Sequence, residues 1–366
     1  MNIINTVFSF LILFVFSSEI IYSQKESDST NSYESLLEAY PYAYYTPETE
    51  LAFGAGGVYT FYTKKEIELN PSSISLSGFY STVQTYEFNF NSSTYFLQNK
   101  IASILKLNFA HTYDRFYGIG NDTPDLGTEQ YILDNYGGIL DFQIPPSLVI
   151  ATRAGFIFEY RIYDVVDALD NPYLNNAPSE VFDVAAISGL GLVLVWDNRD
   201  NIFFPNEGGF TQARSIFYTK DLGSDFTYSF FEVDIRRYWS FGLDHVLALQ
   251  IYFQSTSGEP PFYKYPALGG SNIMRGYFKG RYRDKNYLAV QFEYRQYFWW
   301  RFGFAVFGSS GEVADEITSF SLPNLKHTFG FGLRFLFNEE EKINLRMDLA
   351  FGKDTNGIYF GMEEAF

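Results

Sequence analysis

Apolar and polar residues alternate one by one over much of the chain, and this alternation predicts β-strands rather than helices. From Phe329 to Phe337, every second residue is phenylalanine or leucine, and the residues between them include glycine and arginine. Residues 342–351 and 356–366 follow the same pattern, which places Phe366 on the apolar face of the last predicted strand. A soluble sandwich would bury this apolar face, whereas a transmembrane barrel would turn it toward lipid. The alternation alone is compatible with both architectures.

Fifteen segments have this strand pattern. They are residues 49–64, 72–82, 84–95, 100–113, 129–142, 147–163, 185–197, 209–220, 225–239, 245–257, 283–297, 301–308, 326–337, 342–351 and 356–366. Bacterial single-chain barrels have an even number of strands. We therefore expect one further strand, within residues 38–113.

Short and long connections alternate between the predicted strands. The short ones lie near residues 144–147, 240–244, 299–300 and 338–341. The long ones lie near residues 114–127, 164–180, 255–283 and 309–325. Short turns at one end and long loops at the other are typical of outer-membrane barrels. We therefore predict an all-β, antiparallel transmembrane β-barrel over residues 49–366, with a soluble exported all-β protein as the alternative.

The N-terminus predicts export. The apolar run from Val7 to Phe16 is shorter than the about 20 residues that a membrane-spanning helix needs. Its length fits a signal peptide, which we place at residues 1–23, although no lysine or arginine precedes the run. The alternative is a buried N-terminal strand or helix. Residues 24–48 are then predicted to form a short, polar periplasmic segment ahead of the barrel.

Composition narrows the class of protein further. Aromatic residues make up 20% of the chain, which suits strands and the aromatic girdles of a membrane barrel. No stretch after residue 23 approaches 18 consecutive apolar residues, which excludes a helical membrane protein. The net charge of −17 argues against a nucleic-acid partner. The chain has no cysteine, which excludes disulfides and a lipoprotein anchor.

Two segments are more specific than a general barrel sequence. The first is Trp196–Asp200 with the following Phe204–Gly209, and the second is Leu268–Tyr277 with the following Gly280–Asp284. Together with Arg346–Asp348 and the final Phe366, they resemble the barrel domain of the BamA/TamA superfamily, also called the bacterial surface antigen family. The positions that match its motifs are Asp197, Arg199, Asp200, Pro205, Gly208, Gly269, Gly270 and Asp348.

This resemblance implies a sixteen-stranded barrel with a loop, Arg275-Gly276-Tyr277, folded into the lumen. It implies that Arg275 pairs with Glu293 on the next strand, and alternation places Glu293 on the inward face. A second acidic partner is usual in a Phe-x-Asp-x-Gly motif, but this chain has Ser309 at that position. A hydroxyl can still accept a hydrogen bond from a guanidinium. The resemblance also implies that Phe366 acts as a C-terminal sorting signal.

The physical case for this loop lock, meaning the pairing of Arg275 with acidic groups of the wall, is independent of the family. Arginine has a planar fork of donors that suits a carboxylate, and Gly276 allows a sharp bend beside it. The alternative is a solvated loop arginine. Asp197 and Asp200 could suggest calcium, but they lack the EF-hand spacing, and we interpret them as turn residues.

The sequence has no motif with a catalytic mechanism, and its three histidines, His111, His245 and His327, lie far apart. We expect neither an enzyme nor a metal or cofactor. Full-length members of the family carry periplasmic POTRA modules. The roughly 25 residues between the predicted signal peptide and the first predicted strand are too few for one such module.

We therefore predict a bacterial outer-membrane protein that acts in protein insertion or translocation, or an accessory subunit of such a complex. Its expected partners are outer-membrane lipid, client outer-membrane proteins and other subunits of an assembly complex. In the family the first and last strands pair weakly, and this seam opens laterally. The alternative is a passive channel, or a structural or surface-exposed barrel, whose seam would be fully paired.

Overall fold

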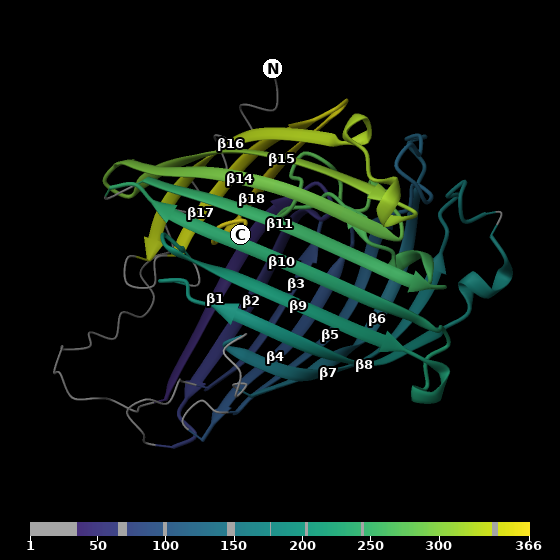
Figure 1. Cartoon of the computed structure of the whole chain (residues 1–366), viewed down its shortest axis with the longest axis horizontal. Helices are drawn as coiled ribbons and strands as arrows, with labels where there is room; N and C mark the ends of the chain where they lie inside the picture. The colour runs from purple at the N-terminus through teal and green to yellow at the C-terminus, as the bar shows by residue number, and fades with distance from the viewer. Residues whose placement is uncertain are drawn as a thin grey trace. The chain divides into compact units, whose positions relative to one another are not determined.

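Sixteen antiparallel strands close into one barrel within the described part of the chain (Figure 1). The computed structural model describes residues 35–64, 72–97, 101–144, 151–175, 177–201, 204–242, 245–338 and 343–366. The barrel strands are β1 (Leu36–Thr46), β2 (Glu50–Phe61), β3 (Ser72–Ser81), β4 (Tyr86–Phe96), β5 (Ile101–Arg115), β6 (Gln130–Ile144), β7 (Arg153–Asp167), β8 (Ala185–Asp197), β9 (Gly208–Tyr218), β10 (Tyr228–Ser240), β11 (His245–Gly258), β14 (Asn286–Trp299), β15 (Phe302–Ala314), β16 (Lys326–Asn338), β17 (Ile343–Gly352) and β18 (Thr355–Met362). The predicted fold class is confirmed.

The strand that sequence analysis left unplaced is β1. It lies in the segment predicted to be a periplasmic entry, so the barrel begins at Leu36 and not at residue 49. Its inward row includes Tyr40, Tyr42 and Tyr44, whose neighbouring ring centroids are 6.3 Å apart. The predicted signal peptide, residues 1–23, and the rest of the polar segment up to residue 34 lie outside the described residues.

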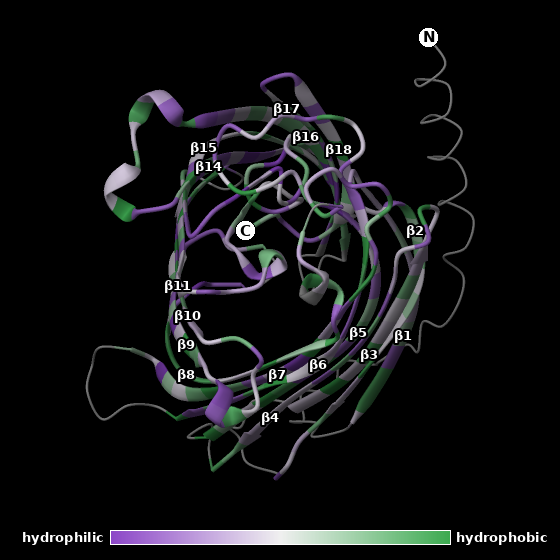
Figure 2. Ribbon diagram, turned by 90° about the vertical axis from the view of Figure 1, so that its right-hand side faces the viewer, coloured by the Kyte–Doolittle hydropathy of each residue, from purple (hydrophilic) through white to green (hydrophobic). Residues whose placement is uncertain are grey.

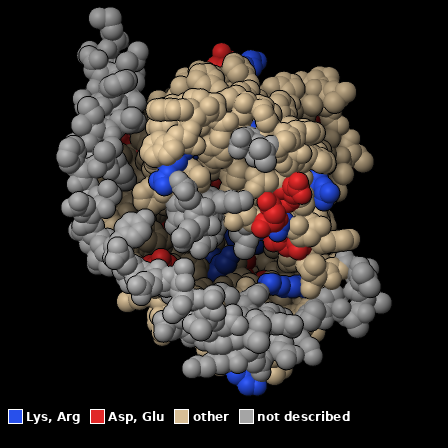
Figure 3. Space-filling model, turned by 90° about the vertical axis from the view of Figure 1, so that its left-hand side faces the viewer, with Lys and Arg blue, Asp and Glu red and all other residues tan. Residues whose placement is uncertain are grey.

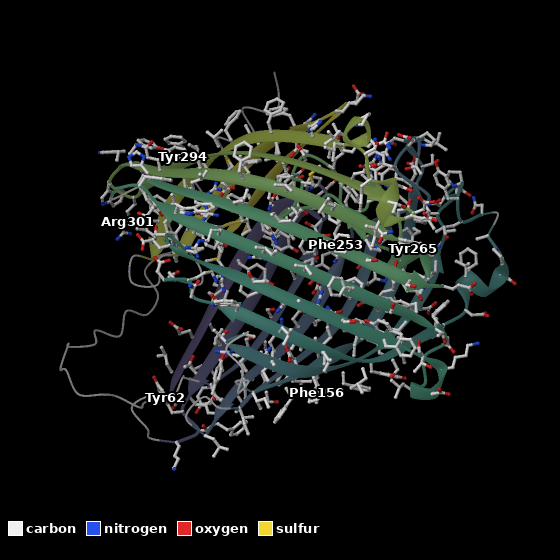
Figure 4. All side chains as sticks on the ribbon, viewed as in Figure 1. Tyr62, Phe156, Phe253, Tyr265, Tyr294 and Arg301 are labelled. Carbon is white, nitrogen blue, oxygen red and sulfur yellow. The ribbon has the colours of Figure 1, made fainter. Side chains whose placement is uncertain are left out.

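The apolar face of the strands points outward. On β14, Val290 and Phe292 are exposed, whereas the residues on the opposite face, Gln291, Glu293 and Arg295, are buried. Phe156 on β7 is 60% exposed and points away from the barrel (Figure 4). Apolar residues outside and charged residues inside are the arrangement of a transmembrane barrel.

The two ends of the barrel differ, as the loop lengths predict. The connections after β6, β10, β14 and β16 are short and share one end, where Tyr62 and Arg301 lie in Figure 4. The connections after β5, β7, β11 and β15 are long and share the other end, near Tyr265. Short turns are periplasmic and long loops extracellular in outer-membrane barrels.

The helical elements are short. They are the 3-10 turns η1 (Ser179–Phe182), η2 (Lys220–Leu222), η3 (Phe262–Lys264), η4 (Ile317–Ser319) and η5 (Leu322–Asn324). Across the described residues, no helix has the length and apolar character needed to cross a membrane.

The barrel closes at a seam between β1 and β18. The register between these two strands is a single residue pair, Tyr45 opposite Phe360. Their other neighbours are paired along their length, from Leu36 to Thr46 on β1 and from Thr355 to Met362 on β18. The first predicted strand, residues 49–64, corresponds to β2 and therefore does not border the seam.

The last strand is shorter than predicted. It ends at Met362, and Glu363 has a φ of 66°, which turns the chain. Phe366 is therefore not on the lipid-facing side: it is buried with Ala365 against Tyr238 and Ala248. Figure 2 shows the C-terminal end of the chain inside the ring of strands.

Candidate functional site: a charged cluster inside the barrel

The long connection between β11 and β14 folds back on itself. It contains a small sheet of β12 (Ala267–Leu268) and β13 (Tyr282–Arg283). Gly270 N donates to Tyr277 O at 3.1 Å, and Gly269 and Gly270 have φ values of 105° and 122°. Because residues other than glycine rarely adopt these φ values, the two glycines permit the tight reversal of the chain. Loop segments lie inside the ring of strands in Figure 2.

Arg275, at the tip of this loop, is paired with two carboxylates of the inner wall. Its Nη2 donates to Glu293 on β14, and its Nη1 donates to Asp348 Oδ2 on β17 at 2.5 Å. The guanidinium also lies 3.5 Å from the ring centroid of Phe307 on β15. Arg275 is 1% exposed, so the pair is shielded from water and matters more than a surface pair.

Three further arginines surround the same carboxylates. Arg295 donates to Glu293 at 2.7 Å, and Arg334 donates to Asp348 at 2.6 Å. Arg334 also donates to Glu364, just beyond β18, at 2.7 Å. The fourth guanidinium is Arg346. We call these residues the inner cluster: Arg275, Glu293, Arg295, Arg334, Arg346, Asp348 and Glu364. Figure 3 views the short-turn end, where acidic and basic side chains gather beside the opening.

The loop tip is also hydrogen-bonded to the last hairpin. Gly276 N donates to Tyr359 Oη at 2.8 Å, and Thr355 Oγ1 donates to Gly276 O at 3.0 Å. Lys353 N donates to Tyr277 Oη at 3.1 Å. Gly276 has a φ of 108°, and a Cβ there would lie 3.0 Å from the backbone of Phe351. This position therefore requires glycine, and the loop is tied to the strand that forms one side of the seam.

Ser309 does not take part in these contacts, contrary to our expectation. Its hydroxyl lies 2.5 Å from Thr328 Oγ1 on β16. The second acidic partner of Arg275 is instead Asp348, which sequence analysis identified only as a motif position. The available signal was its inward place in the predicted strand 342–351.

The first motif forms the turn between β8 and β9. Arg199 donates to Asp197 through Nε at 2.9 Å and Nη2 at 2.7 Å. Asp200 accepts from Asn206 Nδ2 at 3.0 Å, and from the backbone N–H groups of Asn206 and Glu207 at 2.8 and 3.1 Å. Burial alone would raise the pKa of Asp200, but these hydrogen bonds outweigh it and hold the pKa below its usual value. Among the described residues, no group of three or more His, Asp or Glu is placed to hold a metal ion.

The same turn reaches the inner cluster. Pro205 and Phe204 are buried, and Gly208 has a φ of 89° where β9 begins. The rings of Phe204 and Phe366 lie 5.7 and 5.6 Å from the Arg295 guanidinium. Arg295 Nη2 also donates to Phe366 O at 2.7 Å. Sequence analysis found both motifs but did not predict that both reach the inner cluster, the first through Phe204 beside Arg295 and the second through Arg275.

A second anchor holds the long loop on another part of the wall. Lys264 Nζ lies 3.4 Å from Glu159 Oε1 on β7, and Tyr218 Oη donates to the other oxygen of Glu159 at 2.5 Å. The neighbouring Phe262 packs against Phe116 and Tyr131, with ring centroids 4.6 and 5.3 Å apart. No pattern in the sequence pointed to this anchor.

Comparisons with known proteins agree with this architecture. Residues 70–366 match the model of the Omp85 superfamily domain. A crystal structure of BamA from Haemophilus ducreyi lacking POTRA domains 1–3 superposes with a TM-score of 0.63 at 14% identity, covering 90% of this chain and 70% of that one. CdiB from Acinetobacter baumannii superposes with a TM-score of 0.55 at 13% identity, covering 90% of this chain.

The chain spans only 59% of the CdiB chain. No curated protein is significantly similar in sequence. At these identities the two structures show a shared fold, whereas the family match covers most of the chain and confirms the resemblance drawn from the motifs. The chain belongs to the Omp85 superfamily and is a barrel of the bacterial outer membrane.

Proposed function

We propose that this barrel inserts proteins into the outer membrane or translocates them across it, itself or as a subunit of a larger complex. The observation that carries the proposal is the seam, where β1 and β18 share one residue pair. Two strands that are joined over a single residue pair cost little free energy to separate. A passive channel has no need of such a seam.

The part of β1 that precedes Tyr45 supports this role. From Leu36 to Tyr44, the register with β18 contains no residue pair among the described residues, and Leu36, Leu37 and Tyr40 are exposed. An unpaired strand edge is a template for another strand. Pro41 lacks a backbone N–H, and proline in a sheet is confined to edge strands. We therefore propose client outer-membrane proteins as partners at this edge.

The inner cluster would control the seam. Glu364 and Tyr359 belong to the β18 side, and both are tied to the loop and the wall by hydrogen bonds. With Arg275 in place, the hairpin of β17 and β18 is held against β16 and the loop. We propose that release of the loop frees this hairpin, and that other subunits of an assembly complex, or the lipid around the barrel, influence that step.

The test is a disulfide across the seam, made from Tyr45→Cys and Phe360→Cys in this cysteine-free chain. Paired strand residues have Cα atoms about 4.5–5.5 Å apart, which suits a disulfide. Proteoliposomes containing the protein would receive a urea-denatured eight-stranded outer-membrane barrel, and its folded fraction would be read from heat-modifiability on a gel.

We expect the oxidised variant to lose its effect on client folding and to regain it after reduction. The matched control is Leu349→Cys with Ile358→Cys, which are register partners on the fully paired strands β17 and β18. Equal client folding with the seam open or cross-linked would refute lateral opening and would favour the passive barrel.

A further inference from the structure

The inner cluster has one positive charge that its carboxylates do not satisfy. Arg275, Arg295 and Arg334 each donate to a carboxylate at 2.7 Å or less. Arg346 is 6% exposed, yet its nearest carboxylate atom, Asp348 Oδ2, lies 3.6 Å away. Among the described residues, Nε and Nη1 of Arg346 have no hydrogen-bond partner. Asp348 already accepts from two other arginines.

The register increases this imbalance. Arg346 lies directly opposite Arg334 on β16, and like charges at opposed positions destabilise a sheet. On its other side Arg346 lies opposite Gly361 on β18. A Cβ at Gly361 would meet no atom within 4 Å, so open space lies beside Arg346 in the direction of the seam.

A cavity of about 260 Å³ occupies this part of the seam. Its inward lining includes Arg346, Tyr42, Tyr44 and Tyr359, and its outward lining is apolar, with Ala43, Phe360 and Met362. Because residues of both faces line it, the cavity passes between the two strands. It is larger than a single ion needs.

We propose that this seam cavity binds the phosphate of an anionic phospholipid, with Arg346 as its charged contact. A guanidinium binds a phosphate through two parallel hydrogen bonds, and burial strengthens them. The cavity runs from a cation on the inner side to apolar residues on the bilayer side, which is the order of a phosphate and its acyl chains. A polypeptide on the β1 edge would need no such apolar exit.

The position along the barrel also suits a headgroup. Arg346 is the fourth residue of β17, so it lies about 10 Å along the strand from the short-turn end, at about 3.4 Å per residue. A phospholipid of the leaflet at that end could therefore place its phosphate at the cavity. Such a lipid would fill the seam while β1 and β18 remain apart.

The test is native mass spectrometry of the protein purified from outer membranes in detergent. Phosphatidylglycerol is compared with a diacylglycerol of the same acyl chains, which lacks the phosphate. We expect one phosphatidylglycerol to be retained at least about tenfold more strongly, as for one charge-assisted hydrogen bond.

Two variants remove the site in different ways. Arg346→Gln removes the cation, and Gly361→Leu fills the open space without changing any charge; both should abolish the preference for phosphatidylglycerol. Arg237→Gln is the matched control. Arg237 is on β10, is exposed on the outer face, and lies near the short-turn end of the barrel, as Arg346 does. Heat-modifiability checks that each variant is folded, and if Arg346→Gln is not, Gly361→Leu decides alone.

Equal retention of the two lipids by the wild-type protein, or an unchanged preference in the folded variants, would overturn the proposal. Inorganic phosphate that binds at Arg346 without any lipid preference would assign the site to a free anion. A peptide whose terminal carboxylate competes better than phosphatidylglycerol would assign it to a polypeptide. Either of these two results would also overturn the proposal that the cavity binds a phospholipid.

Discussion

Arg275 Nη1 and Asp348 Oδ2 lie 2.5 Å apart inside the barrel, although the two residues are 73 positions apart in the chain. Arg275 comes from the loop after β11, and Asp348 comes from β17, next to the seam strand. This pair connects the tip of the loop to the part of the wall that would move if the seam opened. The loop lock therefore holds the strands beside the seam in place, in addition to fixing the loop inside the lumen.

The first prediction separates Asp348 from Ser309. Asp348→Asn removes a charge that is shared by Arg275 and Arg334, and breaking a buried pair in this way costs about 3–5 kcal/mol. Ser309→Ala loses only the contact with Thr328, worth about 1 kcal/mol. Urea unfolding, followed by heat-modifiability, measures both. A larger loss for Ser309→Ala than for Asp348→Asn would contradict the assignment of Asp348 as the second acidic partner.

The roles of Asp348 and Ser309 illustrate which part of the site the sequence predicts and which part it does not. Alternation placed Glu293 and Asp348 on the inward face, and the structure has both there. Alternation describes one strand at a time, however, and it does not say which wall carboxylate a loop arginine will reach. That depends on the path of the loop across the lumen, which long-range packing sets.

The strand β1 escaped sequence analysis for a related reason. In the middle of the strand, Tyr40, Tyr42 and Tyr44 point inward, whereas Ala39, Pro41 and Ala43 lie on the outward row, so the large residues of this part are on the inner side. Pro41 also argues against a strand unless that strand is an edge. The turn after Met362 was hidden as well, because contacts of Glu364 and Phe366 with distant arginines hold it.

The second prediction concerns the anchor at Lys264. Lys264→Met removes the ion pair between the loop and Glu159, which keeps only Arg161 of its own strand at 3.2 Å. The loop around Phe262 should therefore loosen while the Arg275 contacts remain. Hydrogen exchange should therefore become faster in residues 259–268 than in residues 274–278, because the opening is local. Lys279→Met is the control, since Lys279 is an exposed residue of the same loop. Uniform acceleration along the whole loop would show that the two anchors do not act separately.

The third prediction is a pH dependence at the turn between β8 and β9. The pKa of Asp200 is lowered in the folded protein, so its contacts stabilise the fold above about pH 4, its usual pKa, and are lost as the pH falls through the folded pKa. Asp200→Asn should cost no more than about 1 kcal/mol at neutral pH, because the partly exposed group is screened.

Urea unfolding of the wild type and Asp200→Asn at pH 7 and pH 3 measures this effect. The difference between the two proteins should be present at pH 7 and should shrink at pH 3. A difference that stays constant would mean that the ionised carboxylate does not hold the turn.

The fourth prediction concerns Phe366, which we propose has two roles. As a sorting signal it would act on the unfolded chain, whereas in the folded barrel it packs against Tyr238 and Ala248. Phe366→Ala should therefore lower the amount of protein in the outer membrane. It should also lower the free energy of unfolding of refolded protein by about 3–5 kcal/mol, as for other buried phenylalanines.

Phe329→Ala is the control, because Phe329 is 65% exposed on the lipid-facing side and lies on β16, away from the C-terminus. It should change the stability in detergent less than Phe366→Ala does. Reduced amounts in the membrane with unchanged stability of the refolded Phe366→Ala protein would leave only the sorting role. Reduced stability with unchanged targeting would leave only the packing role, and the last residue would then serve to hold Arg295 and the end of β18 inside the barrel.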